Sequence, residues 1–343
     1  MTANSMAGAG GLPAHGLSGE GALARVSEWF QRSGISRGRA ARASRLSGGA
    51  IQENWRLEMD DGERFVLRTD ADASIPSSCS RPEEYARYSL AYSHGARVAR
   101  PYGLCEDRSV IGKPFFILEF VSGETAGHVL VKDNAVPDRE ALAHELGELL
   151  GVIHRVPAVD ITPVFGVPPS ATALASIQHI RRQLDELPEP HLGAEVCLRE
   201  LEARLGRETE AVFAHGDYRT GNYMVDKGRV SAILDWEFSG WSHPLEDIGW
   251  FTAPCWRFGR CDMGGGGVGS LQSFLDGYRH STGRHVDASE LVDWQALAQI
   301  KWAVIALHQE ARHISGAQRS LELALSGRLV SGLVLEAMKL MEI

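Results

Sequence analysis

The sequence lacks several features that would assign it to a well-defined class of protein. Its five cysteines are scattered and form no C-x-x-C pair, which argues against a disulfide framework or a zinc site and favours a reducing cytoplasm. No apolar run approaches the roughly 18 residues of a membrane-spanning helix, so no membrane partner is expected. Residues 1–21 are rich in glycine, alanine and serine without the pattern of a signal peptide, and we expect a disordered leader there.

An excess of basic residues is also missing. The 343 residues include 35 Lys and Arg against 44 Asp and Glu, which gives a formal net charge of −9. Because binding to a phosphate backbone requires a basic face, this balance argues against a nucleic-acid partner. The composition, 44% hydrophobic and 23% charged, is that of a globular protein large enough for two lobes, and it specifies no oligomeric state.

The first third of the chain shows mainly strand patterns. An Asp-Asp-Gly turn at 60–62 stands between two of them and is a strong hairpin signal. The predicted elements are a helix over 22–33, strands over 43–46, 54–59 and 64–68, a helix over 83–93 and a buried strand over 115–121.

Helical patterns predominate after residue 124. The predicted helices are 142–153, 172–187, 195–206, 244–253, 270–282, 289–313 and 318–342, with short strands at 223–225 and 230–234. The glycine run at 264–267 is predicted to be part of a flexible loop. We therefore predict an α+β, bilobal fold, with a strand-rich N-lobe over 22–121 and a mostly helical C-lobe over 122–343.

Candidate catalytic residues are concentrated in the segment His-Gly-Asp-Tyr-Arg-Thr-Gly-Asn at 215–222. Asp217 and Asn222 stand five positions apart, and Asp235 follows a short apolar strand. Phosphoryl transfer needs a carboxylate that orients the attacking hydroxyl and oxygen ligands for a magnesium ion that bridges the phosphates. Protein kinases use the same order and spacing in their catalytic loop and metal-binding Asp. Each residue alone would fit a turn, but the combination predicts a magnesium-dependent kinase.

From about residue 22 to its C-terminus, the chain resembles the aminoglycoside phosphotransferase family, the small-molecule branch of the kinase-like fold. It is most similar to bacterial phosphotransferases that also resemble the kinase domains fused to some acyl-CoA dehydrogenases. The resemblance implies a protein-kinase-like fold, Mg²⁺ as cofactor, and ATP or GTP as co-substrate. The residues that it implies are Asp217 as the catalytic carboxylate, Asn222 and Asp235 as metal ligands, His215 as a structural residue and Asp247 as a buried acid that braces the loop.

The resemblance also points to a nucleotide site in the N-lobe. Gly48 and Gly49 lie between two predicted strands, where a glycine-rich hairpin could place backbone amides over phosphates. The alternative is an ordinary turn, in which paired glycines are common. The backbone from Glu119 to Val121 falls where a kinase hinge would pair with the nucleobase.

Two positions depart from the kinase pattern. Arg68 stands where kinases place the lysine that contacts the α- and β-phosphates, with Glu84 as its expected ion-pair partner and Glu83 as a substitute. An arginine keeps the charge but grips phosphate with a planar fork rather than a point charge. In the second departure, the family's Gly-Asp-Pro after the metal-binding Asp is replaced by Ser-His-Pro, with His243 in place of the acid.

The acceptor is expected to be a small molecule with a hydroxyl group. Residues 241–320 hold eight Asp and Glu and seven Lys and Arg, which gives no support to a strongly cationic aminoglycoside. Trp256-Arg257-Phe258 and Lys301-Trp302 would suit an anionic or partly apolar compound such as a hydroxyacyl-CoA, although core tryptophans and surface cations would give the same pattern. Phosphorylation of an aminoglycoside or macrolide antibiotic is the second interpretation.

The residues of the sequence disfavour two other classes of function. A non-catalytic nucleotide-binding module would share the fold, but such modules lose catalytic residues, and Asp217, Asn222 and Asp235 are all present. An acyltransferase or hydrolase is disfavoured because the sequence contains no G-x-S-x-G motif. The sequence therefore favours an active kinase.

Overall fold

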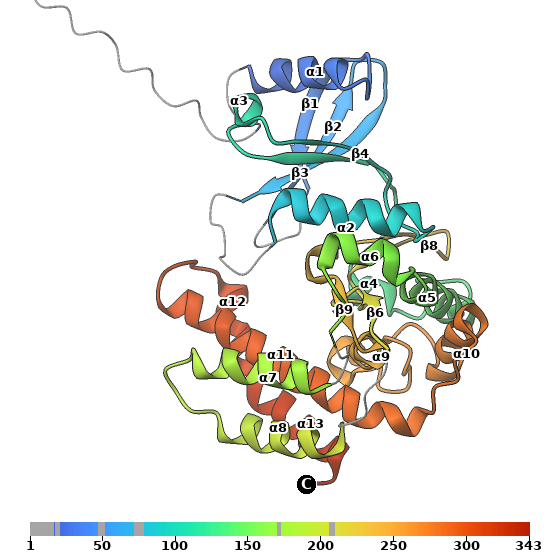
Figure 1. Cartoon of the computed structure of the whole chain (residues 1–343), viewed down its shortest axis with the longest axis vertical. Helices are drawn as coiled ribbons and strands as arrows, with labels where there is room; N and C mark the ends of the chain where they lie inside the picture. Colours follow the sequence, from blue (N-terminus) through green and yellow to red (C-terminus); the bar gives the residue numbers. More distant parts are fainter. Residues whose placement is uncertain (1–16, 18–20, 47–51, 72–78, 170–172, 206–209) are drawn as a thin grey trace, which may run out of the picture. The chain divides into compact units, whose positions relative to one another are not determined.

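The computed structural model describes residues 17, 21–46, 52–71, 79–169, 173–205 and 210–343 (Figure 1). It confirms the predicted α+β class, with an antiparallel sheet in one part of the chain and mostly helices in the other. The chain divides into two compact units, residues up to Tyr85 with Arg100–Phe120, and Ala86–Ala99 with Val121–Ile343. The predicted N-lobe range of 22–121 thus differs from the first unit mainly by including Ala86–Ala99.

The first unit is built on a five-stranded antiparallel sheet of order β1-β2-β3-β5-β4. Its strands are β1 (Ala40–Arg45), β2 (Gln52–Met59), β3 (Arg64–Asp70), β4 (Pro101–Cys105) and β5 (Phe115–Glu119). The predicted hairpin turn joins β2 and β3, where Gly62 has a φ of 89° that suits glycine. Strand β4 was not predicted, and β5 ends two residues earlier than expected.

The core of this unit lies between the sheet and α1 (Ala22–Arg32), with α3 (Arg108–Ile111) beside it. Val26 and Phe30 of α1 are fully buried and belong to the same apolar cluster as Leu57 and Phe115 of the sheet. Leu17 is buried in this cluster as well, so at this residue the predicted leader is part of the core. The rest of the leader, apart from Gly21, lies outside the described residues.

Helix α2 (Arg81–Ser93) begins in the first unit and ends in the second. Its first turn is held by a capping box, a pair of reciprocal hydrogen bonds at the helix N-terminus. The Ser80 amide donates to Glu83 Oε2 over 2.7 Å, and the Glu83 amide donates to Ser80 Oγ over 3.4 Å. Glu83 is therefore engaged in capping the helix.

The second unit is mostly helical, as predicted. Its helices are α4 (Gly127–Leu130), α5 (Arg139–His154), α6 (Ala158–Phe165), α7 (Ala173–Asp185), α8 (Leu192–Arg204), α9 (Pro244–Thr252), α10 (Leu271–Thr282), α11 (Leu291–Ile314), α12 (Leu321–Ser326) and α13 (Val330–Met341). Short 3-10 turns lie at Trp236–Phe238, Pro254–Trp256, Ala288–Glu290 and Gly327–Leu329. No helix in the described ranges is both long and apolar enough to cross a membrane.

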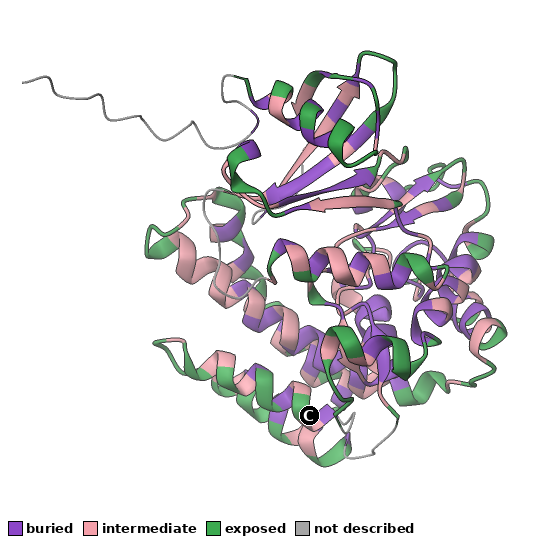
Figure 2. Cartoon of the chain, turned by 45° about the horizontal axis from the view of Figure 1, so that its top comes forward, coloured by how far each residue is buried: buried purple, intermediate pink, exposed green. Residues whose placement is uncertain are grey.

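Helix α11 forms the centre of one core of this unit. Its apolar residues pack in one cluster with those of α7, α8 and α13. The buried part of α11 ends at Ala306, and its last turns are only partly covered (Figure 2). The bounds of α11 agree with the helix that the sequence predicts over 289–313, except that its first residues form a 3-10 turn.

Two antiparallel pairs of short strands lie in the second unit. Strands β7 (Tyr223–Asp226) and β8 (Arg229–Ile233) form the predicted hairpin, in which Lys227 and Gly228 have φ angles of 50° and 80°. The pair of β6 (Val212–Ala214) with β9 (Gly240–Ser242) was not predicted. Together these pairs flank the segment that contains the candidate catalytic loop.

Two predictions for the C-terminal part were wrong. The helix expected over 318–342 is divided into α12, a 3-10 turn and α13, and a Cβ atom at Gly327 within this turn would overlap the Glu310 carboxylate of α11. The glycine run predicted as a flexible loop is instead packed, since Gly265, Gly266 and Gly267 are buried and the Gly266 carbonyl accepts a 2.6 Å hydrogen bond from Thr220 Oγ1. Both segments depend on close tertiary packing.

Candidate functional site

The candidate catalytic loop begins directly after β6 and is anchored by a buried carboxylate. The backbone amides of His215 and Gly216 donate to Asp247 Oδ2 and Oδ1 over 2.7 and 2.9 Å. Gly216 has a φ of 80°, and a Cβ atom there would overlap the Phe238 carbonyl, so only glycine fits. Asp247, which lies on α9, therefore braces the loop as the sequence predicts.

The His215 ring ties the loop to the end of β8. Its Nε2 donates to the Leu234 carbonyl over 2.8 Å, and its Nδ1 accepts from the Asp217 amide over 3.2 Å. Only a neutral ring can make both bonds, and burial lowers the pKa of His215, which favours that form. His215 thus has the structural role that the resemblance implies.

Three side-chain N–H groups converge on the Asp217 carboxylate. Oδ1 accepts from Trp250 Nε1 over 2.7 Å and from Arg219 Nε over 3.0 Å. Oδ2 accepts from Asn222 Nδ2 over 2.5 Å. The side chain of Asp217 is 14% exposed, so the carboxylate is fixed in orientation and still accessible. This is the arrangement required of a group that orients a reacting hydroxyl.

The two candidate metal ligands are connected through the backbone. The Leu234 amide donates to the Asn222 carbonyl over 2.8 Å, which holds Asn222 beside the residue that precedes Asp235. Asn222 Nδ2 also donates to the Asp217 carbonyl over 3.0 Å. No described residue donates to Asn222 Oδ1. A carbonyl oxygen of this kind and a carboxylate are the hard oxygen ligands that Mg²⁺ prefers, so these residues fit the ion.

Asp247 also accepts a hydrogen bond from His154, which in turn contacts Tyr278. Its Oδ2 accepts from His154 Nε2 over 3.2 Å, and His154 Nδ1 lies 2.9 Å from the Tyr278 hydroxyl. Burial alone would raise the pKa of Asp247, but the hydrogen bonds from the His154 ring and from the His215 backbone amide outweigh burial, so the pKa is lowered. The chain from Tyr278 through His154 keeps the bracing carboxylate ionised.

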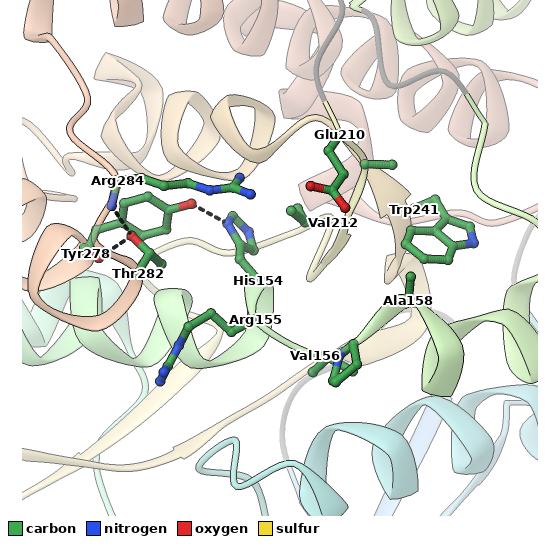
Figure 3. A pocket seen from close by; sticks show the side chains of 12 residues that line it. His154, Arg155, Val156, Ala158, Glu210, Val212, Trp241, Tyr278, Thr282 and Arg284 are labelled. Atoms are coloured by element: carbon green, nitrogen blue, oxygen red, sulfur yellow. Dashed lines mark hydrogen bonds between the residues drawn. The ribbon is translucent and has the colours of Figure 1, made fainter.

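A cavity of about 270 Å³ opens behind this chain of hydrogen bonds. Figure 3 shows Tyr278 and His154 on its wall, joined by their hydrogen bond, with Glu210 and Trp241 on the opposite side. Its lining includes none of the candidate catalytic and metal-binding residues. We therefore assign no substrate to this cavity.

His243 accounts for the departure from the family's Gly-Asp-Pro. Its Nδ1 accepts a 3.1 Å hydrogen bond from the Leu245 amide, so the ring caps the N-terminus of α9 as an Asp would. The ring also stacks on Trp294 at a centroid distance of 4.3 Å. Burial lowers the pKa of His243 to about 4, which keeps Nδ1 free to accept. The substitution preserves the helix that carries Asp247.

Aromatic and cationic side chains line the surroundings of Asp217. Trp256 packs between Trp250 and Trp302, with ring centroids 5.1 and 5.0 Å away. The guanidinium of Arg219 lies 4.4 Å from the centre of the Trp256 ring, and the Lys301 ammonium lies 4.9 Å from that of Trp250. These contacts are cation–π interactions in geometry. They place two positive charges near the candidate catalytic carboxylate.

The other residues predicted for the acceptor region differ in position. Arg257 donates to the Thr252 carbonyl from Nε and Nη2 over 3.0 and 2.6 Å, so it stabilises the backbone after α9. Phe258 is exposed and has a φ of 49°. Of the basic residues predicted there, Lys301 faces the loop, since its Nζ lies 3.5 Å from the Gly216 carbonyl and 3.2 Å from Glu246 Oε1.

In the first unit, the predicted pair of Arg68 and Glu84 is present. Arg68 Nη2 lies 2.7 Å from Glu84 Oε1, and both side chains are almost completely buried. Arg68 Nη1 also donates to Asn54 Oδ1 over 3.2 Å. Arg81 contacts the other oxygen of Glu84 and lies 2.8 Å from Asp70 Oδ1. Two arginines therefore share one buried glutamate, Glu84, as the sequence predicts for Arg68.

The remaining nucleotide-site predictions concern the glycine turn and the hinge. Gly48 and Gly49 lie outside the described residues. Glu119 ends β5, where its amide donates to the Arg100 carbonyl over 2.9 Å. No described residue provides a backbone acceptor for the Val121 amide. The roles of these four residues stay predictions.

Several residues of the site were not predicted. Trp250 stands three positions after Asp247 on α9, a spacing that places both on one face of the helix, so this signal could have been read. Arg81 stands at the same spacing from Glu84 on α2. His154 carried no local signal, because it reaches Asp247 across 93 positions of the sequence.

The chain is similar to known proteins in sequence and in fold. A family model described as "Phosphotransferase enzyme family" matches residues 42–279. Acyl-CoA dehydrogenase family member 10 of Mus musculus is 26% identical over 58% of the chain and 19% of its own length. Acyl-CoA dehydrogenase family member 11 of Pongo abelii is 24% identical over 94% of the chain and 43% of its own length. The chain therefore spans less than half the length of these curated relatives.

Solved structures show the same fold. A Ralstonia eutropha protein classed as an aminoglycoside phosphotransferase matches with a TM-score of 0.73 and 22% identity, over 93% of this chain and 98% of that one. A choline/ethanolamine kinase family protein of Mesorhizobium loti has a TM-score of 0.62 and 18% identity, over 93% and 95%. A spectinomycin phosphotransferase in complex with ADP and spectinomycin has a TM-score of 0.62 and 11% identity, over 93% and 98%. The predicted kinase-like fold is confirmed.

Proposed function

The chain belongs to the phosphotransferase enzyme family. From this premise we propose that it is a small-molecule phosphotransferase with an alcohol group as acceptor, and that Asp217 is its catalytic carboxylate. The observation that carries the proposal is the convergence of three N–H donors on Asp217, in a loop whose backbone amides are bound by Asp247. A carboxylate held in this way is preorganised for a hydroxyl group that approaches its exposed side.

In the proposed reaction, the acceptor hydroxyl donates a hydrogen bond to Asp217 and its oxygen attacks the γ-phosphorus of a nucleoside triphosphate. A bond forms between the acceptor oxygen and phosphorus, and the bond from the γ-phosphorus to the β–γ bridging oxygen breaks. The hydroxyl proton passes to the carboxylate, and the nucleoside diphosphate leaves with the bridging oxygen. Trp250 and Arg219 hold the carboxylate in place during this transfer.

Asn222 and Asp235 would hold the magnesium ion. When bound, the ion would neutralise charge on the phosphate oxygens. Asn222 uses its amide nitrogen to hold Asp217, so a single side chain would connect the metal ligand set to the catalytic carboxylate. Its Oδ1 is the atom that remains for the ion.

For the nucleotide, we propose Arg68 as the residue that contacts the phosphates, with Gly48 and Gly49 over them and the backbone of Glu119 and Val121 beside the base. Glu84 fixes the Arg68 guanidinium by an ion pair with buried partners. ATP is favoured over GTP as co-substrate, because the spectinomycin phosphotransferase of the same fold binds ADP.

For the acceptor, we propose a hydroxyl compound with an anionic group and a partly apolar body, such as a hydroxyacyl-CoA. Two observations support this class. Arg219 and Lys301 are cations near Asp217, and the partly exposed Trp302, which packs against Trp256, could contact an apolar group. The curated relatives carry acyl-CoA dehydrogenase names. The second candidate, an aminoglycoside or macrolide, is favoured by the Ralstonia and spectinomycin structures.

The proposal is tested first by binding and then by turnover. Millimolar nucleotide with magnesium should raise the melting temperature, as any ligand selective for the folded state does. Nucleotide consumption should then be screened against hydroxyacyl-CoA thioesters, aminoglycosides, macrolides and small amino alcohols. A chain that binds nucleotide but consumes none with any acceptor would instead be the non-catalytic module.

The metal assignment is tested with Asp235→Ala. The variant should lose the magnesium-dependent part of the nucleotide-induced rise in melting temperature, because one of two oxygen ligands is gone. Asp226→Ala, at the exposed last residue of β7, is the matched control and should retain it. Undiminished magnesium dependence in Asp235→Ala would contradict the assignment.

A further inference from the structure

Helices α5 and α10 pack with their backbones in direct contact. A Cβ atom at Gly277 of α10 would overlap the His144 carbonyl of α5, and one at Gly147 of α5 would overlap the Phe274 carbonyl of α10. A third glycine, Gly151 of α5, lies against the side chains of Ser281 and Thr282. Because glycines permit this approach along more than two turns of helix, the two backbones form a rigid frame for the side chains at its edge.

Three side chains with metal-ligating atoms gather at the edge of this frame. His144 and Glu148 stand four residues apart on α5, and His280 faces them from α10. One ligand atom from each lies within 4.8 Å of the other two. The His280 Nδ1 to Glu148 Oε1 distance is 2.7 Å, the His144 Nδ1 to Glu148 Oε2 distance is 3.8 Å, and the two rings are 6.0 Å apart.

We propose that His144, Glu148 and His280 form a binding site for a divalent transition-metal ion of the zinc class. Two imidazoles and one carboxylate are a ligand set that zinc accepts with water in the fourth position. In a tetrahedral site with bonds of about 2.1 Å, ligand atoms lie about 3.4 Å apart, so the side chains need to move by about an ångström. The side chains are 39%, 37% and 74% exposed, which leaves them free to make this adjustment.

The proposed ion is distinct from the magnesium of the phosphoryl-transfer site. Imidazole ligands select zinc, copper or nickel, whereas magnesium prefers oxygen ligands. The site therefore does not depend on the proposed function, and its test can be run with magnesium present throughout. Its effect would be to clamp α5 to α10, the helices that also carry His154 and Tyr278.

The simpler interpretation is that Glu148 and His280 form only a surface ion pair. Such pairs contribute little to stability, and they need no third residue. His144 distinguishes the two interpretations, because a metal site requires it and the pair of Glu148 with His280 does not. The arrangement of both histidines around one carboxylate, on a glycine-packed frame, is what favours a metal.

The experiment uses the full chain without an affinity tag, in buffer with magnesium. Zinc bound after dialysis is counted by elemental analysis, and the melting temperature is measured with zinc and with chelator. We expect one tightly bound zinc per chain and a rise of about 3–6 °C at zinc concentrations near 100 times the Kd. His144→Ala and His280→Ala should lose both effects, while His285→Ala, at another exposed histidine, should keep them.

Equal melting temperatures of all variants in chelator would show that each is folded. The proposal is overturned if wild type binds no zinc, or if His144→Ala and His280→Ala bind as much as His285→Ala does. Loss of binding in His280→Ala with full binding in His144→Ala would also overturn it, because the three-residue site would then not exist.

Discussion

The two units hold their charged site residues by different means. In the first unit, Arg68 and Arg81 share the buried Glu84 and Arg81 also pairs with Asp70, so charge is balanced between side chains. In the second unit, the buried Asp247 is bound by the backbone amides of His215 and Gly216. An ion pair between side chains fixes two side chains, whereas a carboxylate bound by amides fixes the course of the backbone.

The two kinds of contact differ in how far they depend on one particular side chain. At the Arg68 position, a guanidinium stands where protein kinases have an ammonium, and the partner Glu84 lies 2.7 Å from it. At Asp247, no side chain other than a carboxylate could accept from both amides and His154 at once. We therefore expect the first unit to tolerate conservative exchange at its ion pair and the second unit to resist it at Asp247.

The largest expected effect on stability is that of Asp247→Ala. The change leaves two buried amides and His154 without their acceptor, and loss of such a charged partner costs about 3–5 kcal/mol. Urea unfolding followed by circular dichroism should show this loss, and Asp226→Ala, at the exposed last residue of β7, should stay within about 0.5 kcal/mol of wild type. A small effect of Asp247→Ala would mean that the loop does not depend on this carboxylate.

A smaller effect is expected for Arg68→Ala. Glu84 keeps Arg81 as a partner, so the free energy of unfolding should fall by about 2 kcal/mol rather than by the full cost of an unpaired buried charge. Arg68→Lys should lose less, about 1 kcal/mol, because the charge remains. If Arg68→Lys lowered the free energy of unfolding as much as Asp247→Ala in the same assay, the ion pair of the first unit would not be the more tolerant of the two.

The smallest expected effect is the loss of stability that His243 causes as the pH falls. Its folded-state pKa of about 4 lies below the usual value for histidine, so the unfolded chain takes up the proton first as the pH falls. The stabilising contribution is complete above about pH 6.5 and is lost progressively towards pH 4, by about 1–2 kcal/mol between pH 7 and 5. His243→Asp, whose carboxylate can cap α9 throughout this range, should lose less between those two pH values. If wild type and His243→Asp lost the same stability between pH 7 and 5, protonation of His243 would not be the cause of the loss.

Much of this arrangement could be predicted from the sequence, because it depends on motifs with fixed spacing. The loop from His215 to Asn222, the hairpin turn before Arg64 and the pairing of Arg68 with Glu84 are of this kind. The Trp250 to Asp217 bond was not predicted, because the spacing that places Trp250 and Asp247 on one face of α9 does not show that Trp250 reaches a residue 33 positions away. The three-residue strands β6 and β9 were missed because they are too short to show a period.

The two segments of the C-terminal part that differ from the prediction, 264–267 and 318–342, have a common physical cause. Gly327 and Gly266 both lie where a neighbouring segment approaches too closely for a side chain. In sequence, glycine predicts local freedom, yet here it permits contact between segments that are distant along the chain. Such contacts depend on the tertiary fold and leave no periodic pattern.

The central claim is that Asp217 orients and deprotonates the acceptor hydroxyl. Once an acceptor has been found, the most direct test is the turnover of Asp217→Asn, together with its magnesium-nucleotide binding. We predict a turnover lower by about 10²–10⁴-fold, the usual contribution of a positioned base, with the nucleotide-induced rise in melting temperature retained. Wild-type turnover in Asp217→Asn would contradict the claim.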